Sequence, residues 1–192
     1  AGTYALNEKL CLETQRLFYG AQSSADFFKW RENFSASSSR YPLAIVGTHE
    51  HGLELFLKVV QGTQNSNSPK EEIVIVTSEC EPWAQIENSE LKQCYQKHLS
   101  NLLKDYELEK ANFQTKMNEW KSLEDYVQVK HPKPQEPRFP VRFYTESQVT
   151  AIDALSDQEG LYLTVEKFDF ESMQGEHQTL AVSSVFVATG YQ

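Results

Sequence analysis

The sequence lacks several features that mark whole classes of protein. None of its apolar runs approaches the ~20 residues of a membrane-spanning helix. It has no basic block, and its formal net charge is -9, whereas nucleic-acid binding requires a cationic face. Residues 1–16 contain no charged start followed by an apolar segment, which is the pattern of a secretory signal peptide. We therefore expect neither a membrane nor a nucleic acid among its partners.

Cysteine is scarce, and two common catalytic motifs are missing. Cys11, Cys80 and Cys94 are an odd number with no C-x-x-C spacing, which is typical of reduced thiols in a cytoplasmic protein. A G-x-S-x-G nucleophile motif is absent, and so is the G-x-x-x-x-G-K-[ST] motif of P-loop ATPases. The sequence therefore argues against these hydrolases and predicts no catalytic residue of its own.

The most informative stretch is Tyr41–Val60, YPLAIVGTHEHGLELFLKVV. Leu43–Val46 is an apolar run long enough for one buried strand, Gly47 ends it, and Leu53–Val60 has the apolar spacing of a helix. Strand, glycine turn and helix open a dinucleotide-binding βαβ unit, in which the amino end of the helix binds a pyrophosphate.

The glycine turn departs from the G-x-G-x-x-G/A fingerprint. Gly47 and Gly52 stand at the outer positions, but His49 replaces the middle glycine, which normally lets the backbone approach the phosphates. A nucleotide-binding turn and a structural bend both remain open. His49 and His51 also invite a metal interpretation, but no third ligand is evident, so loop histidines are favoured. Protonated histidines would help to hold a phosphate.

The middle of the chain predicts a second strand and a long helical insertion. After a polar loop at Gly62–Lys70, Glu72–Thr77 contains the buried strand IVIV. Apolar residues in Leu91–Val127 recur in steps of three and four, which predicts an amphipathic helix or a pair of helices. Its function is either that of a solvated insertion or that of a coiled-coil contact surface. His131–Pro140, with four prolines, predicts an extended linker.

The last part is rich in β-structure. Gln148–Asp153 and Leu161–Asp169 predict antiparallel strands, Gln174–Glu176 a turn into a third strand near Leu180, and Val185–Ala188 a short buried strand. The predicted fold class is therefore α/β: a Rossmann-like three-layer domain with a parallel sheet, a helical insertion and an antiparallel β meander.

The glycine turn and the closing VFVATGY together resemble the two-dinucleotide-binding flavoproteins, over most of Tyr41–Tyr191. The nearest resemblance is to the NAD(P)H domain of the flavin-dependent lysine/ornithine N-monooxygenases of siderophore synthesis. It implies NAD(P)H as cofactor, with FAD in the complete protein, and hydroxylation of an amine. Ala1-Gly2-Thr3 and Ala188-Thr189-Gly190 stand where chains of that family leave and re-enter the FAD domain.

This resemblance implies a domain organisation and a set of partners. Residues 1–40 would connect from an FAD domain, and residues 41–192 would form the Rossmann-like nucleotide-binding domain, with its helical insertion at about 88–128. The chain would then be an internal piece, inactive alone, that requires the remainder of a flavoprotein or a partner subunit. The helical insertion offers a surface for a homo-oligomer.

The candidate cofactor-binding residues follow from the glycine turn, the end of the second strand and the A-T-G end. They are Gly47, Thr48, His49, Glu50, His51, Gly52, Ser78, Glu79, Ala188, Thr189 and Gly190. A carboxylate at Glu79 would repel a 2′-phosphate and suits a ribose diol, so NADH is not excluded and no preference for NADPH is expected. The alternative function is that of a degenerate Rossmann-like module, acting as a non-catalytic scaffold with Leu91–Val127 as its contact surface.

Overall fold

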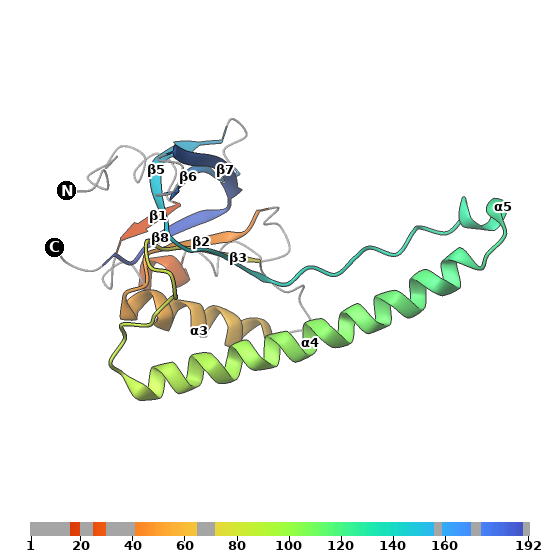
Figure 1. Cartoon of the computed structure of the whole chain (residues 1–192), viewed down its shortest axis with the longest axis horizontal. Coiled ribbons are helices and arrows are strands. Elements are labelled where there is room, and N and C mark those ends of the chain that lie inside the picture. Colours follow the sequence, from red (N-terminus) through yellow and green to blue (C-terminus); the bar gives the residue numbers. More distant parts are fainter. Residues whose placement is uncertain are drawn as a thin grey trace.

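The computed structural model describes residues 16–19, 25–29, 41–64, 72–155, 159–169 and 174–189. They form a five-stranded parallel sheet of order β1-β8-β2-β3-β4 and a three-stranded antiparallel sheet of order β5-β6-β7 (Figure 1). The elements are β1 (Leu17–Tyr19), β2 (Leu43–Val46), α3 (Glu50–Gln64), β3 (Ile73–Val76), α4 (Ser89–Lys121), α5 (Asp125–Gln128), β4 (Val141–Tyr144), β5 (Ser147–Ala154), β6 (Leu161–Asp169), β7 (Gln174–Val182) and β8 (Ser184–Val187).

The parallel sheet lies between two layers. Every residue of β2, β3 and β8 is buried, because successive side chains point to opposite faces and both faces are covered. On one face, side chains such as Ile45 and Phe186 form a core with α3 and with part of α4. On the other, Val46, Val74 and Val187 pack against the antiparallel sheet. This three-layer arrangement confirms the predicted α/β fold class.

Helix α3 is longer than the sequence predicted. It begins at Glu50 and ends at Gln64. The prediction of a polar loop at Gly62–Lys70 was therefore wrong for its first three residues, which belong to the helix. Gly62 is exposed and a Cβ there would have no atom within 4 Å, so the helix continues through this position on its solvent side.

The helical insertion is one helix of 33 residues, α4, followed by the short α5. Only Leu102 and Met117 of α4 are buried, and its far half projects beyond the sheets (Figure 1). The proline-rich segment 132–139 returns toward the sheet without helix or strand, as predicted. Tyr106 of α4 contacts Phe139 of this segment with ring centroids 5.6 Å apart, so the returning segment packs on the helix. Across the described ranges, no helix combines the length and apolarity that a membrane span needs.

Three strand assignments differ from the sequence prediction. Strand β4 was not predicted, because it has four residues, follows Pro140 and lies at the sheet edge with only Val141 buried. Strand β1 has three residues, too few for a periodic pattern, and pairs in parallel with β8. Strand β7 already begins at Gln174, so the predicted turn Gln174–Glu176 is wrong.

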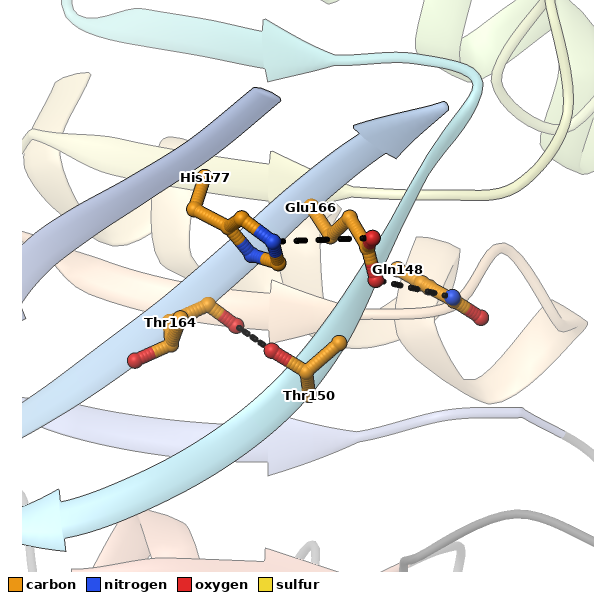
Figure 2. A network of polar contacts seen from close by, with 5 residues as sticks. All are labelled: Gln148, Thr150, Thr164, Glu166 and His177. Atoms are coloured by element: carbon orange, nitrogen blue, oxygen red, sulfur yellow. Dashed lines mark hydrogen bonds and ion pairs between the residues drawn. The ribbon is translucent and has the colours of Figure 1, made fainter. Parts of the chain in front are cut away.

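Gly175 explains why a turn-like sequence extends a strand here. A Cβ at Gly175 would overlap the carboxylate of Glu166 on the neighbouring strand β6. That carboxylate accepts a hydrogen bond from Gln148 Nε2 at 3.4 Å and lies 3.7 Å from His177 Nε2, so it joins all three antiparallel strands (Figure 2). The glycine therefore makes room for a polar contact across the sheet rather than turning the chain.

An aromatic cluster joins the two long helices. The Trp83 ring contacts Phe56 of α3 and Tyr95 of α4, with centroids 5.4 Å and 5.0 Å away, and these two rings contact each other at 5.8 Å. The Trp83 side chain is only 1% exposed. The cluster therefore fixes the connection between β3 and α4 against the helical layer.

The cluster predicts a loss of stability in alkali. Burial, with a smaller contribution from the Glu81 carboxylate, raises the pKa of Tyr95 from 10.0 to about 12. Because the unfolded chain loses this proton first, the contribution to stability is complete below pH 10 and falls as the pH rises toward 12. We expect Tyr95→Phe to lose less unfolding free energy than the parent chain between about pH 9 and about pH 11 in urea titrations. Tyr162→Phe, at a 41% exposed tyrosine, is the control and should behave as the parent. Equal pH dependence in all three proteins would contradict the prediction.

Candidate functional site

A cavity of about 900 Å³ opens at the carboxyl ends of the parallel strands. Its walls are residues 46–50, from the end of β2 to the start of α3, and residues 76–79, from the end of β3 onward. Residues 85–88 before α4, residues 147 and 148 of β5, and Thr189 after β8 complete them. In open α/β sheets this edge is where ligands bind, because neighbouring loops separate there. The cavity is therefore the candidate ligand site.

The outer glycines of the turn have separate roles. Gly47 adopts φ 92°, and a Cβ on it would lie 2.5 Å from the Ala188 carbonyl oxygen. A Cβ on Gly52 would lie 2.9 Å from the Ala188 Cβ and 3.3 Å from Ile45 Cγ2. The first glycine thus makes the tight turn, and the second lets α3 approach the sheet closely, which are the roles of the outer fingerprint positions.

Ala188, which follows β8, packs directly on this turn. The Ala188 amide donates to the Val46 carbonyl at 2.6 Å, and the His49 amide donates to the Ala188 carbonyl at 3.0 Å. The Gly47 amide donates to Val76 at 2.8 Å. Three neighbouring strands, β8, β2 and β3, therefore hold the turn in one position.

The structure brings most of the predicted ligand residues together. The predicted residues that line the cavity are Gly47, Thr48, His49, Glu50, Ser78, Glu79 and Thr189. Gly52 and Ala188 are buried beneath the turn, where they set the packing of α3. His51 lies away from the cavity wall, with Nδ1 3.6 Å from Glu54 Oε2. Gly190 lies outside the described residues.

The amino end of α3 offers backbone donors to the cavity. The His49 carbonyl accepts from the amides of Gly52 at 2.9 Å and Leu53 at 3.3 Å, so His49 caps the helix. The amides of Glu50 and His51 are the first-turn donors that remain without a partner among the described residues. Within the same residues no group of three histidine, cysteine or acidic side chains could hold a metal ion, so nothing there extends the His49–His51 pair into a metal site.

The amino end of a second helix, α4, also lies at this cavity, and the sequence analysis did not predict this contribution. The side-chain oxygen of Asn88 caps α4 by accepting from the Leu91 amide at 3.2 Å, and its side-chain nitrogen Nδ2 donates to Glu50 Oε1 at 3.0 Å. The Asn88-Ser89-Glu90 segment is a recognisable helix start, but the predicted periodicity began only at Leu91. Asn88 therefore links the amino ends of α3 and α4 at the cavity wall.

Thr77 connects the end of β3 to the glycine turn. Its hydroxyl lies 3.1 Å from the Thr48 hydroxyl and accepts from the Glu79 amide at 3.1 Å. The Ser147 amide donates to the Thr77 carbonyl at 2.9 Å, and the Glu146 amide donates to the Glu79 carbonyl at 3.1 Å. The backbone at Glu79 is thus fixed from both sides.

The cavity is acidic in its side chains and positive in its backbone. Glu50, Glu79 and Glu87 line it, whereas no lysine or arginine does so among the described residues. The amino ends of α3 and α4 contribute partial positive charge. Oxygen Oε2 of Glu79 is buried and has no partner within the described part of the chain. This arrangement suits a ligand that presents hydroxyl donors to the carboxylates and an anionic group to the backbone amides.

Comparisons with known proteins reveal a shared fold at low sequence identity. Neither the protein-family models nor the curated proteins contain a match. The structure is similar to FAD-bound DfoA, the cadaverine monooxygenase of the desferrioxamine biosynthetic pathway of Erwinia amylovora, with a TM-score of 0.52 and 11% identity. The match covers 100% of this chain but 42% of DfoA, so the chain spans less than half of that protein. The lysine monooxygenase NbtG from Nocardia farcinica gives a TM-score of 0.41 at 15% identity, over 88% of this chain and 35% of its own. The chain thus has the fold of part of an FAD-bound monooxygenase.

Proposed function

We propose that this chain is the pyridine-nucleotide-binding portion of a flavin-dependent N-hydroxylating monooxygenase of the siderophore-synthesis type. The observation that carries the proposal is the Gly47 turn, which opens onto the cavity at the carboxyl end of β2 and is closed from below by Ala188. The fold shared with DfoA supports it. FAD and the amine site would come from the remainder of the flavoprotein or from a partner subunit.

The residues present fit a dinucleotide in three respects. Gly47 adopts a positive φ and has no room for a side chain, the first-turn amides of Glu50 and His51 remain as donors, and Glu79 supplies an acceptor. When bound, the nucleotide would supply a hydride to the flavin. The chain's own residues would orient its pyrophosphate on the amino end of α3 and its ribose beside β3.

His49 provides the test, because it replaces the glycine that lets a backbone approach the phosphates. It is exposed at the cavity wall, with its ring centroid 5.4 Å from that of His51. We expect His49→Gly to bind NADH more tightly by about 1 kcal/mol, since the first-turn amides can then approach the pyrophosphate. Calorimetric titrations at about pH 6 and about pH 8 would measure this.

The matched control is His51→Ala, which alters the histidine that does not line the cavity and should leave the affinity unchanged. If His49→Gly weakens binding, most strongly at the lower pH, then the charged imidazole itself holds the phosphate and the expected crowding is wrong. If the folded parent chain and both variants bind no nucleotide, the proposed function fails.

A second candidate function is that of a non-catalytic interaction module. The arm formed by α4, α5 and segment 129–140 favours it, because Leu108, Tyr126 and Val129 are 63%, 66% and 88% exposed there (Figure 1). Large apolar side chains on a projecting element are typical of a contact surface, including one between two copies of the chain. The absence of nucleotide binding in a folded chain would support this candidate over the first.

A further inference from the structure

We propose that the free edge of β4 and the groove beside it bind an extended segment of a partner protein, in which basic residues alternate with apolar ones. The segment would pair with β4 as a further strand of the parallel sheet. This surface is distinct from the glycine turn, and the inference does not depend on the proposed function.

The first observation is that β4 ends the parallel sheet. In the order β1-β8-β2-β3-β4 its one described neighbour is β3. The carbonyls of Pro140 and Tyr144 accept hydrogen bonds from the β3 side, at 2.7 Å and 2.9 Å. Backbone groups of successive strand residues point to opposite sides, so those of Val141 and Phe143 point away from β3. Each of these two residues therefore offers one N–H donor and one carbonyl acceptor to an added strand.

The second observation is that β4 lacks most of the devices that block an edge strand. Such edges usually carry an outward charge, an internal proline or a bulge. The Arg142 guanidinium lies 3.6 Å from Glu72 Oε2, next to β3, so its charge is held on the paired side. Pro140 stands before the strand, and the register with β3 runs without a shift. The strand has four residues, which suits a short linear segment as its ligand.

The third observation is a groove of about 530 Å³ beside this edge. Residues 143–145 and Ser147 form one side of it, and residues of β6 and β7 form the other. Its volume is within the range of ligand-binding clefts. The groove therefore leaves space next to β4 for the side chains of an added strand.

The inner face of the antiparallel sheet shows why this space is open. On that face the register pair Leu163–Leu180 is buried against the parallel sheet. Farther along the same face, Gln178 and the pair Lys167–Glu176 are exposed. Side chains of one face change from buried to exposed where the layer beneath them stops, and the parallel sheet stops at β4. The end of the antiparallel sheet therefore overhangs the position of an added strand.

The charges of the groove indicate a cationic occupant. Lys167 Nζ lies 3.5 Å from Glu146 Oε2, so this cation already has a partner. Glu176, which also lines the groove, makes no ion pair with any residue that the structure describes, although Lys167 is its register partner. The formal net charge of -9 favours association with a cationic partner as well. A lysine or arginine of the added strand would therefore meet the Glu176 carboxylate.

The opposite face of β4 indicates the other half of the pattern. Val141 is buried in the core that the sheet forms with α3, and Phe143 is half-buried against that core. Neighbouring strands bring side chains of the same face together, so an added strand gains most from apolar residues there. Because side chains alternate between faces, one segment satisfies both requirements when basic and apolar residues alternate.

The experiment tests the whole chain with a short blocked peptide of alternating lysine and valine residues. Calorimetry should show several-fold weaker binding of the matched glutamate–valine peptide. Methylation of the backbone nitrogens of the lysine–valine peptide should abolish binding, because it removes the donors that pair with β4. Amide hydrogen exchange measured by NMR should slow about tenfold at Phe143 when the peptide is saturating.

Glu176→Gln tests the charge of the groove. We expect it to lower the affinity for the lysine–valine peptide about threefold, the scale of a partly exposed ion pair. The matched control is Glu136→Gln, which removes the same charge from an exposed residue of the proline-rich segment outside the groove. It should leave the affinity unchanged.

Several outcomes would overturn the proposal. They are no binding of the lysine–valine peptide to the folded parent, equal binding of the two peptides, and binding that leaves hydrogen exchange at Phe143 unchanged. A parent that sediments as a dimer with Phe143 already protected would show that a second copy occupies the edge, and the assigned occupant would be wrong. Nucleotide titrations are a separate measurement, so failure of this proposal and failure of the proposed function are distinguishable.

Discussion

Gly47→Ala is expected to lower the free energy of unfolding by about 3 kcal/mol, or to prevent folding altogether. The φ of 92° is a conformation that L-residues adopt only with strain. The added Cβ would also lie 2.5 Å from the Ala188 carbonyl oxygen and 2.7 Å from its carbonyl carbon. These are backbone atoms of a central strand's end, so they cannot move aside as a flexible side chain would.

Gly62→Ala is the matched control for this prediction. Gly62 is exposed near the end of α3, and a Cβ there would meet nothing within 4 Å. Replacing it should raise stability by about 0.5 kcal/mol, because alanine loses less conformational entropy in a helix. Urea titrations monitored by circular dichroism would give the free energy of unfolding of both variants for direct comparison. A Gly47→Ala protein as stable as Gly62→Ala would show that the turn can relax and that its geometry is not fixed by β8.

The parts of the fold that were predictable from sequence are those whose surroundings leave a continuous or periodic pattern. The runs LAIV and IVIV predicted β2 and β3 because strands buried on both faces need apolar side chains at every position. Alternation of Leu161, Leu163 and Val165 with polar neighbours predicted β6, since one face of the antiparallel sheet meets the core and the other meets solvent.

The site could be predicted only where its residues follow a strand directly. Gly47, Thr48 and Glu79 were found in this way, since each comes at or soon after the end of a buried strand. The contribution of α4 was missed, because Asn88 meets Glu50 only through packing between residues 38 apart in sequence. The contact of Thr48 with Thr77 is equally invisible in a local pattern, since it depends on the pairing of β2 with β3.

Trp83→Ala is expected to cost about 4 kcal/mol of unfolding free energy, the usual range for removing a fully buried large aromatic side chain. The indole is 1% exposed and contacts Phe56 and Tyr95, so its loss would leave a cavity between α3 and α4. Its φ of 58° is strained for a bulky residue, and such strain persists only when surrounding packing holds it in place. In the parent chain the packing of the Trp83 indole therefore outweighs the strain of its backbone. Trp83→Ala would lose that packing.

Two further variants separate the packing of Trp83 from its polar atom. The indole Nε1 is buried without a partner in the described residues, so Trp83→Phe removes an unsatisfied donor and should cost much less than Trp83→Ala. Trp120→Ala, at a half-buried tryptophan on the arm whose Nε1 donates to the His131 carbonyl at 3.1 Å, should also cost less, because the arm lies away from the main core. Thermal and urea unfolding would rank the three. If Trp83→Ala proved as mild as Trp120→Ala, the aromatic cluster would not be what fixes the β3–α4 connection, and the position of the cavity wall at Gln85–Asn88 would need another cause.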